Sequence, residues 1–347
     1  MNETTVPTAE ASLSWPHPLP SCWVIGDGRP GLENQSLGLA EAMGLQPALK
    51  RVVLRKPWRI ASPYVTAFKR FAFSSSGASL EAPWPEIAIA TGRPGALPLI
   101  YLREASKGHT FTVQIQDPVV RRGAFDRIVV PWHDGVTGDN IVTMDGSLHI
   151  MTEQRLAAEA PRWVDAFAAI PSPRVAVLIG GVNSRYDLRP EDMRALGDQL
   201  AAVAAQGFGL LVSGSRRTGE ANMAALAEVL VGTGAYIYDG QHGANPYLGM
   251  LAHADAFVVT CDSINMITEA ASTGKPVHIA RLPFRRGRED GRNKFGEFVQ
   301  RLEGSGRVRM FDGRIENWSY EPLREMDRVA QVLRRAFLAR VGDSNLR

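Results

Sequence analysis

Short apolar runs alternate with stretches of helical apolar spacing along most of this chain. The runs are rich in Val, Ile, Leu and Ala, as are strands buried in parallel sheets. The first half contains predicted strands at Cys22–Ile25, Leu49–Leu54, Glu86–Ala90, Phe111–Gln116, Arg127–Pro131 and Asn140–Met144. The predicted helices are Leu32–Met43, Pro63–Phe73, Ala96–Ala105 and Glu153–Ala169, with a turn at Ser74–Gly77.

A second cycle of strands and helices follows Pro171-Ser172-Pro173, where two prolines interrupt the pattern. Its predicted strands are Arg174–Ile179, Phe208–Ser213, Ala235–Tyr238, Ala256–Thr260 and Pro276–Ala280. Its predicted helices are Pro190–Ala205, Thr218–Leu230, Ser263–Thr273 and a last helix from Leu323 to about Arg340. Strands that alternate with helices form parallel sheets covered on both faces. The sequence therefore predicts an α/β protein with two Rossmann-like domains facing a cleft.

The predicted domains follow from the position of this proline linker. Residues 1–20 are read as a disordered tail, 21–170 as the N-terminal Rossmann-like domain, 174–320 as the C-terminal nucleotide-binding domain and 321–347 as a C-terminal helix. The boundary is expected within Pro161–Arg174. A length of 347 residues agrees with about two domains.

Composition excludes several classes of protein. Hydrophobic residues make up 45% and charged residues 22%, as in soluble globular proteins. The net charge is only +3, and the densest basic cluster, Arg285-Arg286-Gly287-Arg288, is followed at once by Glu289-Asp290. That cluster is typical of a solvated loop, so no nucleic-acid partner is expected.

Cysteine content and hydropathy indicate in which compartment of the cell the protein is expected. Its two cysteines, Cys22 and Cys261, exclude a disulfide scaffold and a cysteine zinc site. No run approaches the ~20 apolar residues of a membrane helix, and Met1–Pro20 lacks the basic start and apolar segment of a signal peptide. We expect a cytoplasmic protein with no integral membrane span, for which a peripheral membrane or protein partner stays open.

The first candidate site is the loop Gly26–Gly31, which matches G-x-G-x-x-G between a strand and a helix. Pro30 removes one backbone N–H that a pyrophosphate would need. The next strand ends in Leu54-Arg55-Lys56 and offers no acid for a ribose. Three interpretations stay open: a dinucleotide loop, a tight structural turn, or a turn that presents polar groups to a ligand. Those groups are Asp27, Glu33, Asn34 and Gln35.

The second candidate begins where the strand Ala256–Thr260 leads into a helix. Asp262, Asn265 and Glu269 lie at i, i+3 and i+7, on one helix face. Doubly wound folds bind ligands at the carboxyl ends of strands, and a helix start offers N–H groups to an anion. The alternative is N-capping by Asp262 or Ser263 with a solvated face.

Three further loops join strands to helices. Ser213–Thr218 carries Arg216 and Arg217 and reads as a phosphate clamp, or else as a surface loop. Gly180–Ser184 includes Asn183, and Gly240–Tyr247 includes Asn245. Because carboxyl ends of parallel strands meet at one edge, these loops are expected to converge.

Several chemistries lack their motifs. The chain has no G-x-S-x-G, Walker-A, H-E-x-x-H or D-x-D motif, and its seven histidines show no metal spacing. No metal or cofactor is therefore predicted. His133 follows a strand and fits either a structural role or that of a base.

These loops, in this order, resemble the mitochondrial fission Elm family, a group found in plants and bacteria. The carrying residues are Asp27-Gly28, Gly31, Glu33–Ser36, Gln116-Asp117-Pro118, Pro131, His133-Asp134, Gly180-Gly181, Ser215–Thr218, Asn245–Tyr247, Asp262-Ser263, Met266, Glu269-Ala270 and Thr273–Val277. The resemblance spans about Cys22 to Arg340. It implies a GT-B glycosyltransferase fold in which the second domain holds most of a nucleotide-sugar. It also implies that Glu269 lies near the ribose and Ser215–Thr218 near the phosphates.

Two functions follow as hypotheses: a metal-independent glycosyltransferase using a nucleotide-sugar, and a non-catalytic nucleotide-binding or scaffold protein related to mitochondrial fission factors. The predicted ligand-binding residues are Asn34, Gln35, Gly180, Gly181, Asn183, Ser215, Arg216, Arg217, Thr218, Asn245, Asp262, Ser263, Asn265, Met266 and Glu269. The candidate bases are Glu33, His133, Asp27 and Asp117. Glu33 is preferred because a helix N-terminus favours its ionised form, although it fits a mere capping residue too.

Overall fold

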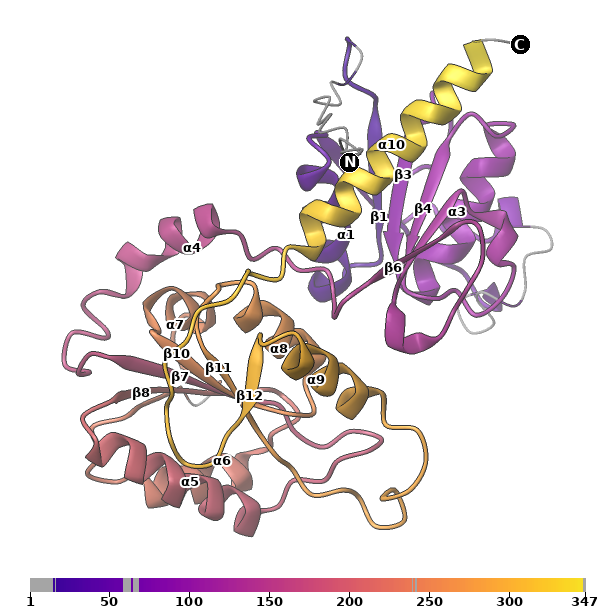
Figure 1. The fold of residues 1–347 in the computed structure, drawn as a ribbon. Helices are drawn as coiled ribbons and strands as arrows, with labels where there is room; N and C mark the ends of the chain where they lie inside the picture. The colour runs from indigo at the N-terminus through magenta and orange to yellow at the C-terminus, as the bar shows by residue number, and fades with distance from the viewer. Residues whose placement is uncertain are drawn as a thin grey trace, which may run out of the picture. The chain divides into compact units, whose positions relative to one another are not determined.

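The computed structural model describes residues 15, 17–58, 64, 69–238, 240 and 242–345, which form two compact units (Figure 1). Unit 1 comprises Met1–Val130, Val136–Met144 and Met326–Arg347. Unit 2 comprises Pro131–Gly135 and Asp145–Glu325. Within the described part of the chain, no helix is long and apolar enough to cross a membrane.

Unit 1 is built on a six-stranded sheet of order β2-β1-β3-β4-β5-β6. Its strands are β1 (Cys22–Gly26), β2 (Pro47–Arg51), β3 (Ile87–Thr91), β4 (Phe111–Ile115), β5 (Arg127–Pro131) and β6 (Ile141–Met144). Its helices are α1 (Pro30–Ala42), α3 (Arg93–Ala105) and α10 (Glu325–Asn345), with short 3-10 turns at Lys69–Phe71 and Arg122–Ala124. β1 pairs in parallel with both β2 and β3.

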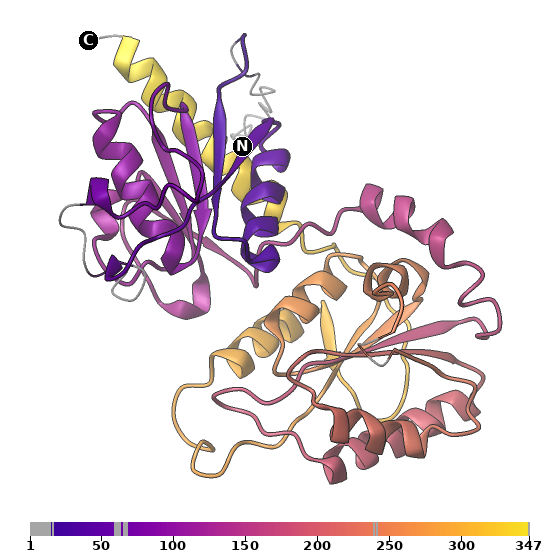
Figure 2. The same cartoon turned by 180° about the vertical axis from the view of Figure 1, so that it is seen from behind.

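Unit 2 is built on a second six-stranded sheet, of order β12-β11-β10-β7-β8-β9. Its strands are β7 (Arg174–Ile179), β8 (Gly209–Gly214), β9 (Tyr236–Tyr238), β10 (Ala256–Thr260), β11 (Val277–Ala280) and β12 (Val308–Met310). Its helices are α4 (Glu153–Glu159), α5 (Pro190–Ala205), α6 (Glu220–Val229), α7 (Tyr247–His253), α8 (Ile264–Ala271) and α9 (Lys294–Gly304), with 3-10 turns at Trp132–Asp134 and Ala160–Trp163. Helices α5 and α6 cover one face, and α7, α8 and α9 cover the other (Figures 1 and 2).

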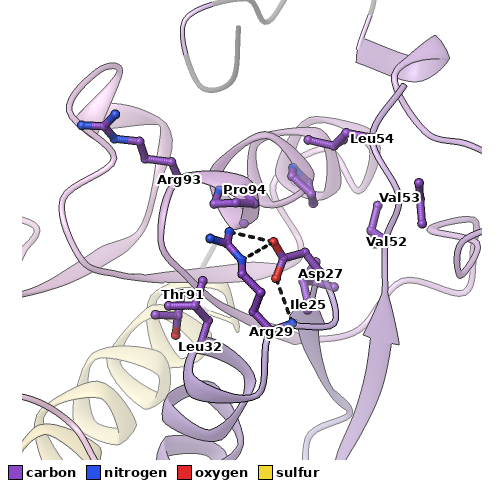
Figure 3. Close-up of a pocket in the computed structure, with 13 residues that line it drawn as sticks. Ile25, Asp27, Arg29, Leu32, Val52, Val53, Leu54, Thr91, Arg93 and Pro94 are labelled. Atoms are coloured by element: carbon purple, nitrogen blue, oxygen red, sulfur yellow. Dashed lines mark hydrogen bonds and ion pairs between the residues drawn. The ribbon is translucent and has the colours of Figure 1, made fainter. Parts of the chain in front are cut away.

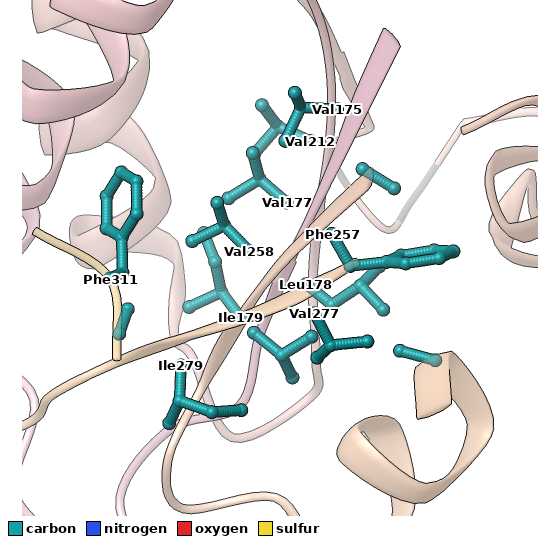
Figure 4. Packing of buried hydrophobic residues seen from close by; sticks show 14 of the residues in the cluster. Val175, Val177, Leu178, Ile179, Val212, Phe257, Val258, Val277, Ile279 and Phe311 are labelled. Carbon is teal, nitrogen blue, oxygen red and sulfur yellow. The ribbon is translucent and has the colours of Figure 1, made fainter. Parts of the chain in front are cut away.

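The core of unit 2 lies on the two central strands of its sheet. Every residue of β10 is buried, and so is all of β7 after Arg174. Val177 and Val258 lie together on one face of the sheet, and Phe257 and Val277 lie together on the other (Figure 4). Continuous apolar runs of this kind are stable only when helices cover both faces. The predicted fold class, two Rossmann-like α/β domains, is confirmed by these sheets.

The boundaries between the two compact units do not lie at the proline linker. Segment 153–170 joins unit 2 because the Trp163 and Phe167 rings stack at 5.7 Å and Phe167 also meets the His253 ring of α7. The C-terminal helix joins unit 1, where the Phe337 ring contacts the rings of Trp15 and Phe111. The proline pair thus precedes the start of β7, whereas the units are divided by side-chain packing.

The structure also contains elements that the sequence pattern did not predict. These are α7, α9 and β12, and the predicted helix Glu153–Ala169 is shortened to α4 and one 3-10 turn. Residues 63 and 65–68 of the predicted helix Pro63–Phe73 and most of the predicted tail lie outside the described residues, and Lys69–Phe71 forms a 3-10 turn. Trp15, inside that predicted tail, is buried and donates a hydrogen bond from Nε1 to the Met43 carbonyl at 2.6 Å.

Candidate functional site

The strand order of the second sheet reverses beside β7. β8 pairs with one side of β7 and β10 with the other, and open α/β sheets bind ligands in the crevice beyond such a reversal. Three of the predicted loops follow these strands: Gly180-Gly181 after β7, Ser215–Thr218 after β8 and Asp262-Ser263 after β10. The structure therefore brings together loops that are 35 to 80 residues apart in sequence, as the hydrogen bonds to Gly180 show.

The Asp262 carboxylate lies among these loops, and its side chain is fully buried. It accepts hydrogen bonds from the Gly181 N–H at 2.9 Å and from the Thr260 hydroxyl at 2.7 Å. It also pairs with the Arg217 guanidinium at 2.9 Å. The Thr260 hydroxyl in turn accepts from the Gly180 N–H at 2.7 Å. Asp262 therefore ties the ends of β7 and β10 to the loop after β8.

Gly180 and Gly181 are required by this close packing. A Cβ atom on Gly180 would lie 2.2 Å from an Asp262 carboxylate oxygen, and one on Gly181 would lie 2.1 Å from the Arg217 carbonyl oxygen. Both distances are shorter than any normal contact. The double glycine that the sequence analysis read as a ligand turn thus also has a local steric cause.

Ser215 and Thr218 direct their hydroxyl groups into the turn after β7. Ser215 Oγ donates to the Gly180 carbonyl at 2.6 Å, and Thr218 Oγ1 donates to the Ile179 carbonyl at 3.0 Å. Thr218 Oγ1 also accepts from the Ser215 N–H at 2.8 Å. These hydroxyls stabilise the loop from within, and the exposed side chains of the loop are those of the neighbouring arginines, Arg216 and Arg217.

Arg216 and Arg217 differ in their surroundings. Arg217 donates to the Gly181 and Val182 carbonyls at 3.1 and 3.3 Å, in addition to its pair with Asp262. Arg216 is exposed and has no hydrogen bond or ion pair within the described part of the chain. Of the two guanidiniums, Arg216 is the one that a new anion can engage without breaking an internal contact.

The remaining predicted residues around α8 have separate roles. Asn183 donates from Nδ2 to the Asp262 carbonyl at 3.3 Å, and its Oδ1 accepts from the Arg185 and Tyr186 N–H groups. Ser263 precedes α8 but makes no side-chain cap, so the first turn of α8 has no side-chain acceptor. Asn265 is exposed, whereas Met266 packs against the core.

A tyrosine that the sequence analysis did not select pairs with Glu269. The Tyr247 hydroxyl of α7 donates a short hydrogen bond to the Glu269 carboxylate of α8. Burial raises the pKa of Glu269 to about 7, although the tyrosine hydrogen bond opposes the rise. Asn245 supports the start of α7, since its Oδ1 accepts from the Tyr247 N–H at 3.0 Å. The motif Asn245-Pro246-Tyr247 was the available signal for this contact.

In unit 1 the sheet order reverses between β1 and β3, and a cavity of about 450 Å³ lies beyond these strands (Figure 3). Asp27 and Arg29, in the predicted loop Gly26–Gly31, line it and form an ion pair of 2.7 Å. Asn34 is exposed and Gln35 is partly buried, and neither lines this cavity.

The buried Glu33 side chain contacts the backbone of the loop that follows β1. Its carboxylate accepts from the Gly28 N–H at 2.8 Å and pairs with Arg51 at 3.0 Å. Hydrogen bonds from Arg51 lower the pKa of Glu33 despite its burial. Only 4% of the Glu33 side chain is exposed. The structure thus gives Glu33 a loop-anchoring contact, while its role as a base stays a prediction. No sequence signal had pointed to Arg51.

Asp117 and His133, the other candidate bases, follow β4 and β5. Asp117 pairs with Arg122 at 2.8 Å, and hydrogen bonds from that arginine lower its pKa. The buried His133 ring packs against Phe298 of α9, within unit 2, and its Nδ1 has no hydrogen-bond partner among the described residues. Burial lowers the pKa of His133, so its imidazole is neutral near pH 7.

Acidic, histidine and cysteine side chains do not gather into a metal site in the part of the chain that the structure describes. The basic cluster Arg285–Arg288 is exposed, in the loop between β11 and α9. That loop is held to the loop after β7, because Arg185 donates to the Glu289, Asp290 and Gly291 carbonyls.

A solved structure and two curated proteins resemble this chain. A putative UDP-N-acetylglucosamine 2-epimerase from Listeria monocytogenes shares its fold with a TM-score of 0.50 and 10% identity, over 90% of this chain and 87% of that one. An uncharacterized protein from Rickettsia prowazekii is 27% identical, over 90% of this chain and 97% of its own length. The architecture of the chain is GT-B-like.

The family assignment rests on sequence. The mitochondrial fission protein ELM1 of Arabidopsis thaliana is 30% identical, with 91% of each protein covered. The family model described as mitochondrial fission ELM1 matches residues 30–337, which include most of the candidate site residues. The resemblance predicted from the loops is confirmed, and the chain belongs to the mitochondrial fission ELM1 family.

Proposed function

We propose that unit 2 binds the diphosphate of a nucleotide-sugar at the loops after β7, β8 and β10. The observation that carries this proposal is the joining of these loops around Asp262 at the reversal of the strand order. Arg216 supplies an exposed guanidinium there, and α8 begins there without a side-chain cap. Guanidiniums and helix N-termini are both suited to phosphate oxygens.

The Tyr247–Glu269 pair is proposed as the contact for the ribose. Glu269 is one helical turn and a half beyond the start of α8, on the same helix as the phosphate-binding end. The Glu269 carboxylate can accept a hydrogen bond from a ribose hydroxyl, because an ionised carboxylate is an acceptor with several free lone pairs. The position matches the one that the family resemblance implies for Glu269.

The proposed reaction is a metal-independent glycosyl transfer. A base removes the proton of an acceptor hydroxyl, and the acceptor oxygen bonds to the anomeric carbon. The bond from that carbon to the diphosphate breaks, and Arg216 with the α8 N-terminus stabilises the leaving group. Neutral His133 is in the protonation state that a base needs. Glu33, Asp27 and Asp117 are the carboxyl candidates.

A second candidate function is non-catalytic nucleotide binding, in a scaffold related to mitochondrial fission factors. One observation favours it: each carboxylate proposed as a base already pairs with an arginine. These pairs are Asp27–Arg29, Glu33–Arg51 and Asp117–Arg122. A paired carboxylate is a weaker base, because the neighbouring cation favours its ionised form.

Nucleotide binding is tested first. A thermal-shift screen of nucleoside diphosphates and nucleotide-sugars identifies a ligand, because a ligand of the folded state raises the melting temperature. Titration calorimetry then compares the wild type with Arg216→Ala and with Arg194→Ala, a control on α5 that pairs with Glu228. Loss of one charged hydrogen bond should weaken binding about 10- to 100-fold in Arg216→Ala only. Equal affinity in all three proteins would contradict the phosphate assignment.

Catalysis is tested separately with the identified nucleotide-sugar. Transfer to an acceptor or to water is followed for the wild type, Glu33→Gln and His133→Gln. A catalytic base predicts loss of turnover with nucleotide affinity unchanged. Nucleotide binding without turnover in the wild type, across an acceptor screen, would support the scaffold function.

A further inference from the structure

The cavity of unit 1 is lined by two different kinds of surface. One wall is aliphatic and is formed by Ile25, Leu32, Val52, Val53, Leu54, Pro94 and Pro98. The other carries the Asp27–Arg29 pair, while the side chain of Arg93 extends away from that pair (Figure 3). A volume of about 450 Å³ lies in the range of small-molecule sites, and such sites combine apolar walls with a few polar groups.

The aliphatic wall is preformed by backbone hydrogen bonds. The Val53 carbonyl accepts from the Ser74 N–H at 2.8 Å, and the Arg55 N–H donates to the Ala72 carbonyl at 2.8 Å. A Cβ on Gly77 would lie 2.6 Å from the Val53 N, so the two segments are closely packed. Val53 nevertheless keeps 44% of its surface exposed. Val52 and Leu54 lie on the cavity side of this segment, whereas Val53 points to its other side (Figure 3).

The charged wall favours an anion. Arg29 presents its guanidinium to the cavity, whereas Arg93 points away from it and lies near Asp117 (Figure 3). The lining also includes residues at the starts of α1 and α3, two 13-residue helices without side-chain caps, and helix starts carry positive partial charge. The Asp27–Arg29 pair is exposed on both sides, with 27% and 57% of the side chains accessible. Such a pair contributes little, so an incoming anion can compete for Arg29.

A nucleotide fits this cavity poorly. A base and a ribose need several hydrogen-bonding side chains, and among the described residues of the lining the only hydroxyl belongs to Thr91. That hydroxyl lies 2.7 Å from the hydroxyl of Ser36, in a buried hydrogen bond. We propose that this cavity is a binding site for an amphipathic anion, in which a phosphate or carboxylate meets Arg29 and an aliphatic body lies on Val52 and Leu54. The site is independent of the nucleotide site proposed for unit 2.

The experiment separates the head from the body of the ligand. The full chain is titrated calorimetrically with octyl phosphate below its micelle-forming concentration, with octyl glucoside and with inorganic phosphate. Octyl phosphate should bind saturably, at one molecule per chain and at least tenfold more tightly than either other probe. If octyl glucoside binds equally well, the anionic group does not contribute to binding. If inorganic phosphate binds equally well, the aliphatic wall does not contribute. Either result overturns the proposal.

Variants locate the binding. Leu54→Asp and Arg29→Glu change side chains that line the cavity and should each weaken octyl phosphate binding at least tenfold. The matched controls are Val231→Asp, at a valine that is 80% exposed in unit 2, and Arg194→Glu on α5. Circular dichroism confirms that each variant is folded. Unchanged affinity in both cavity variants overturns the proposal.

The nucleotide site is distinguished by its own variant. Arg216→Ala should leave octyl phosphate binding unchanged, and the nucleotide found for unit 2 should not displace octyl phosphate. Failure of nucleotide binding would then leave the cavity proposal intact, whereas displacement by the nucleotide would overturn it.

Discussion

Asp262→Ala is expected to destabilise unit 2, because this buried carboxylate joins three loops. The substitution leaves the buried Gly181 N–H without an acceptor, and it removes the acceptor of the Thr260 hydroxyl. A buried donor left unsatisfied costs about 1–3 kcal/mol. Arg217 has 41% of its side chain exposed and can be hydrated, so its lost ion pair adds only about 0–1 kcal/mol. Together these effects predict a loss of about 2–4 kcal/mol.

Native-state hydrogen exchange measures this loss within one unit. Peptides that cover β7 and β10 report the opening of unit 2, and peptides that cover β3 and β4 of unit 1 serve as an internal reference. A loss of about 2–4 kcal/mol speeds exchange about 30- to 700-fold when exchange requires opening of the unit.

The control for this prediction is Asp198→Ala, at an exposed aspartate of α5 in the same unit. Surface substitutions of this kind change stability by less than about 0.5 kcal/mol. If Asp262→Ala and Asp198→Ala protect the β7 and β10 amides equally well, Asp262 does not hold the loops, and the reasoning is refuted.

Three further predictions concern single side chains. Burial raises the pKa of Glu269 from 4.5 to about 7, so the protonated side chain stabilises the folded protein. This stabilisation is complete below pH 4.5 and is lost as pH rises through 7. Glu269→Gln should remove this pH dependence of the unfolding free energy, at most about 3 kcal/mol, as measured by urea unfolding. Gly26→Ala places a Cβ 2.3 Å from Glu33 Oε1, and should lower the stability of unit 1 by about 1–3 kcal/mol in hydrogen exchange. Gly249→Ala places a Cβ 2.3 Å from the Trp163 ring and should shift the fluorescence and lower the melting temperature of unit 2; an unchanged melting curve would show that the ring moves at no cost.

At the candidate site, the sequence predicted which residues lie at the sheet edge but not the direction of their side chains. The glycines after β7 and the aspartate after β10 were selected because they follow apolar runs, and parallel strands bring such positions to one edge. The direction of each side chain could not be read in the same way. Asp262 and Thr218 turn inward to backbone groups, whereas Arg216 turns outward. The spacing of residues along the chain does not distinguish an inward from an outward side chain. That direction depends on which hydrogen-bonding groups the neighbouring loops offer.

The partners of buried charges were also beyond the sequence. Glu33 was selected for its place at a helix start, but Arg51 is 18 residues away, on β2. Tyr247 meets Glu269 from another helix, 22 residues away. These pairs depend on which strands and helices become neighbours, and no periodic pattern records that.

The sequence by itself determined the class of the protein, because buried parallel strands must be apolar throughout and their connecting helices must have one apolar face. It determined the order of most strands and helices, although not α7, α9 and β12, and the placing of glycine turns at strand ends. Tertiary structure alone decided the order of strands in each sheet, and the assignment of Pro131–Gly135 to unit 2 and of Met326–Arg347 to unit 1. Those outcomes rest on contacts between distant segments, such as His133 with Phe298 and Phe337 with Phe111. Burial of these rings is favourable only where the whole chain has brought complementary surfaces together.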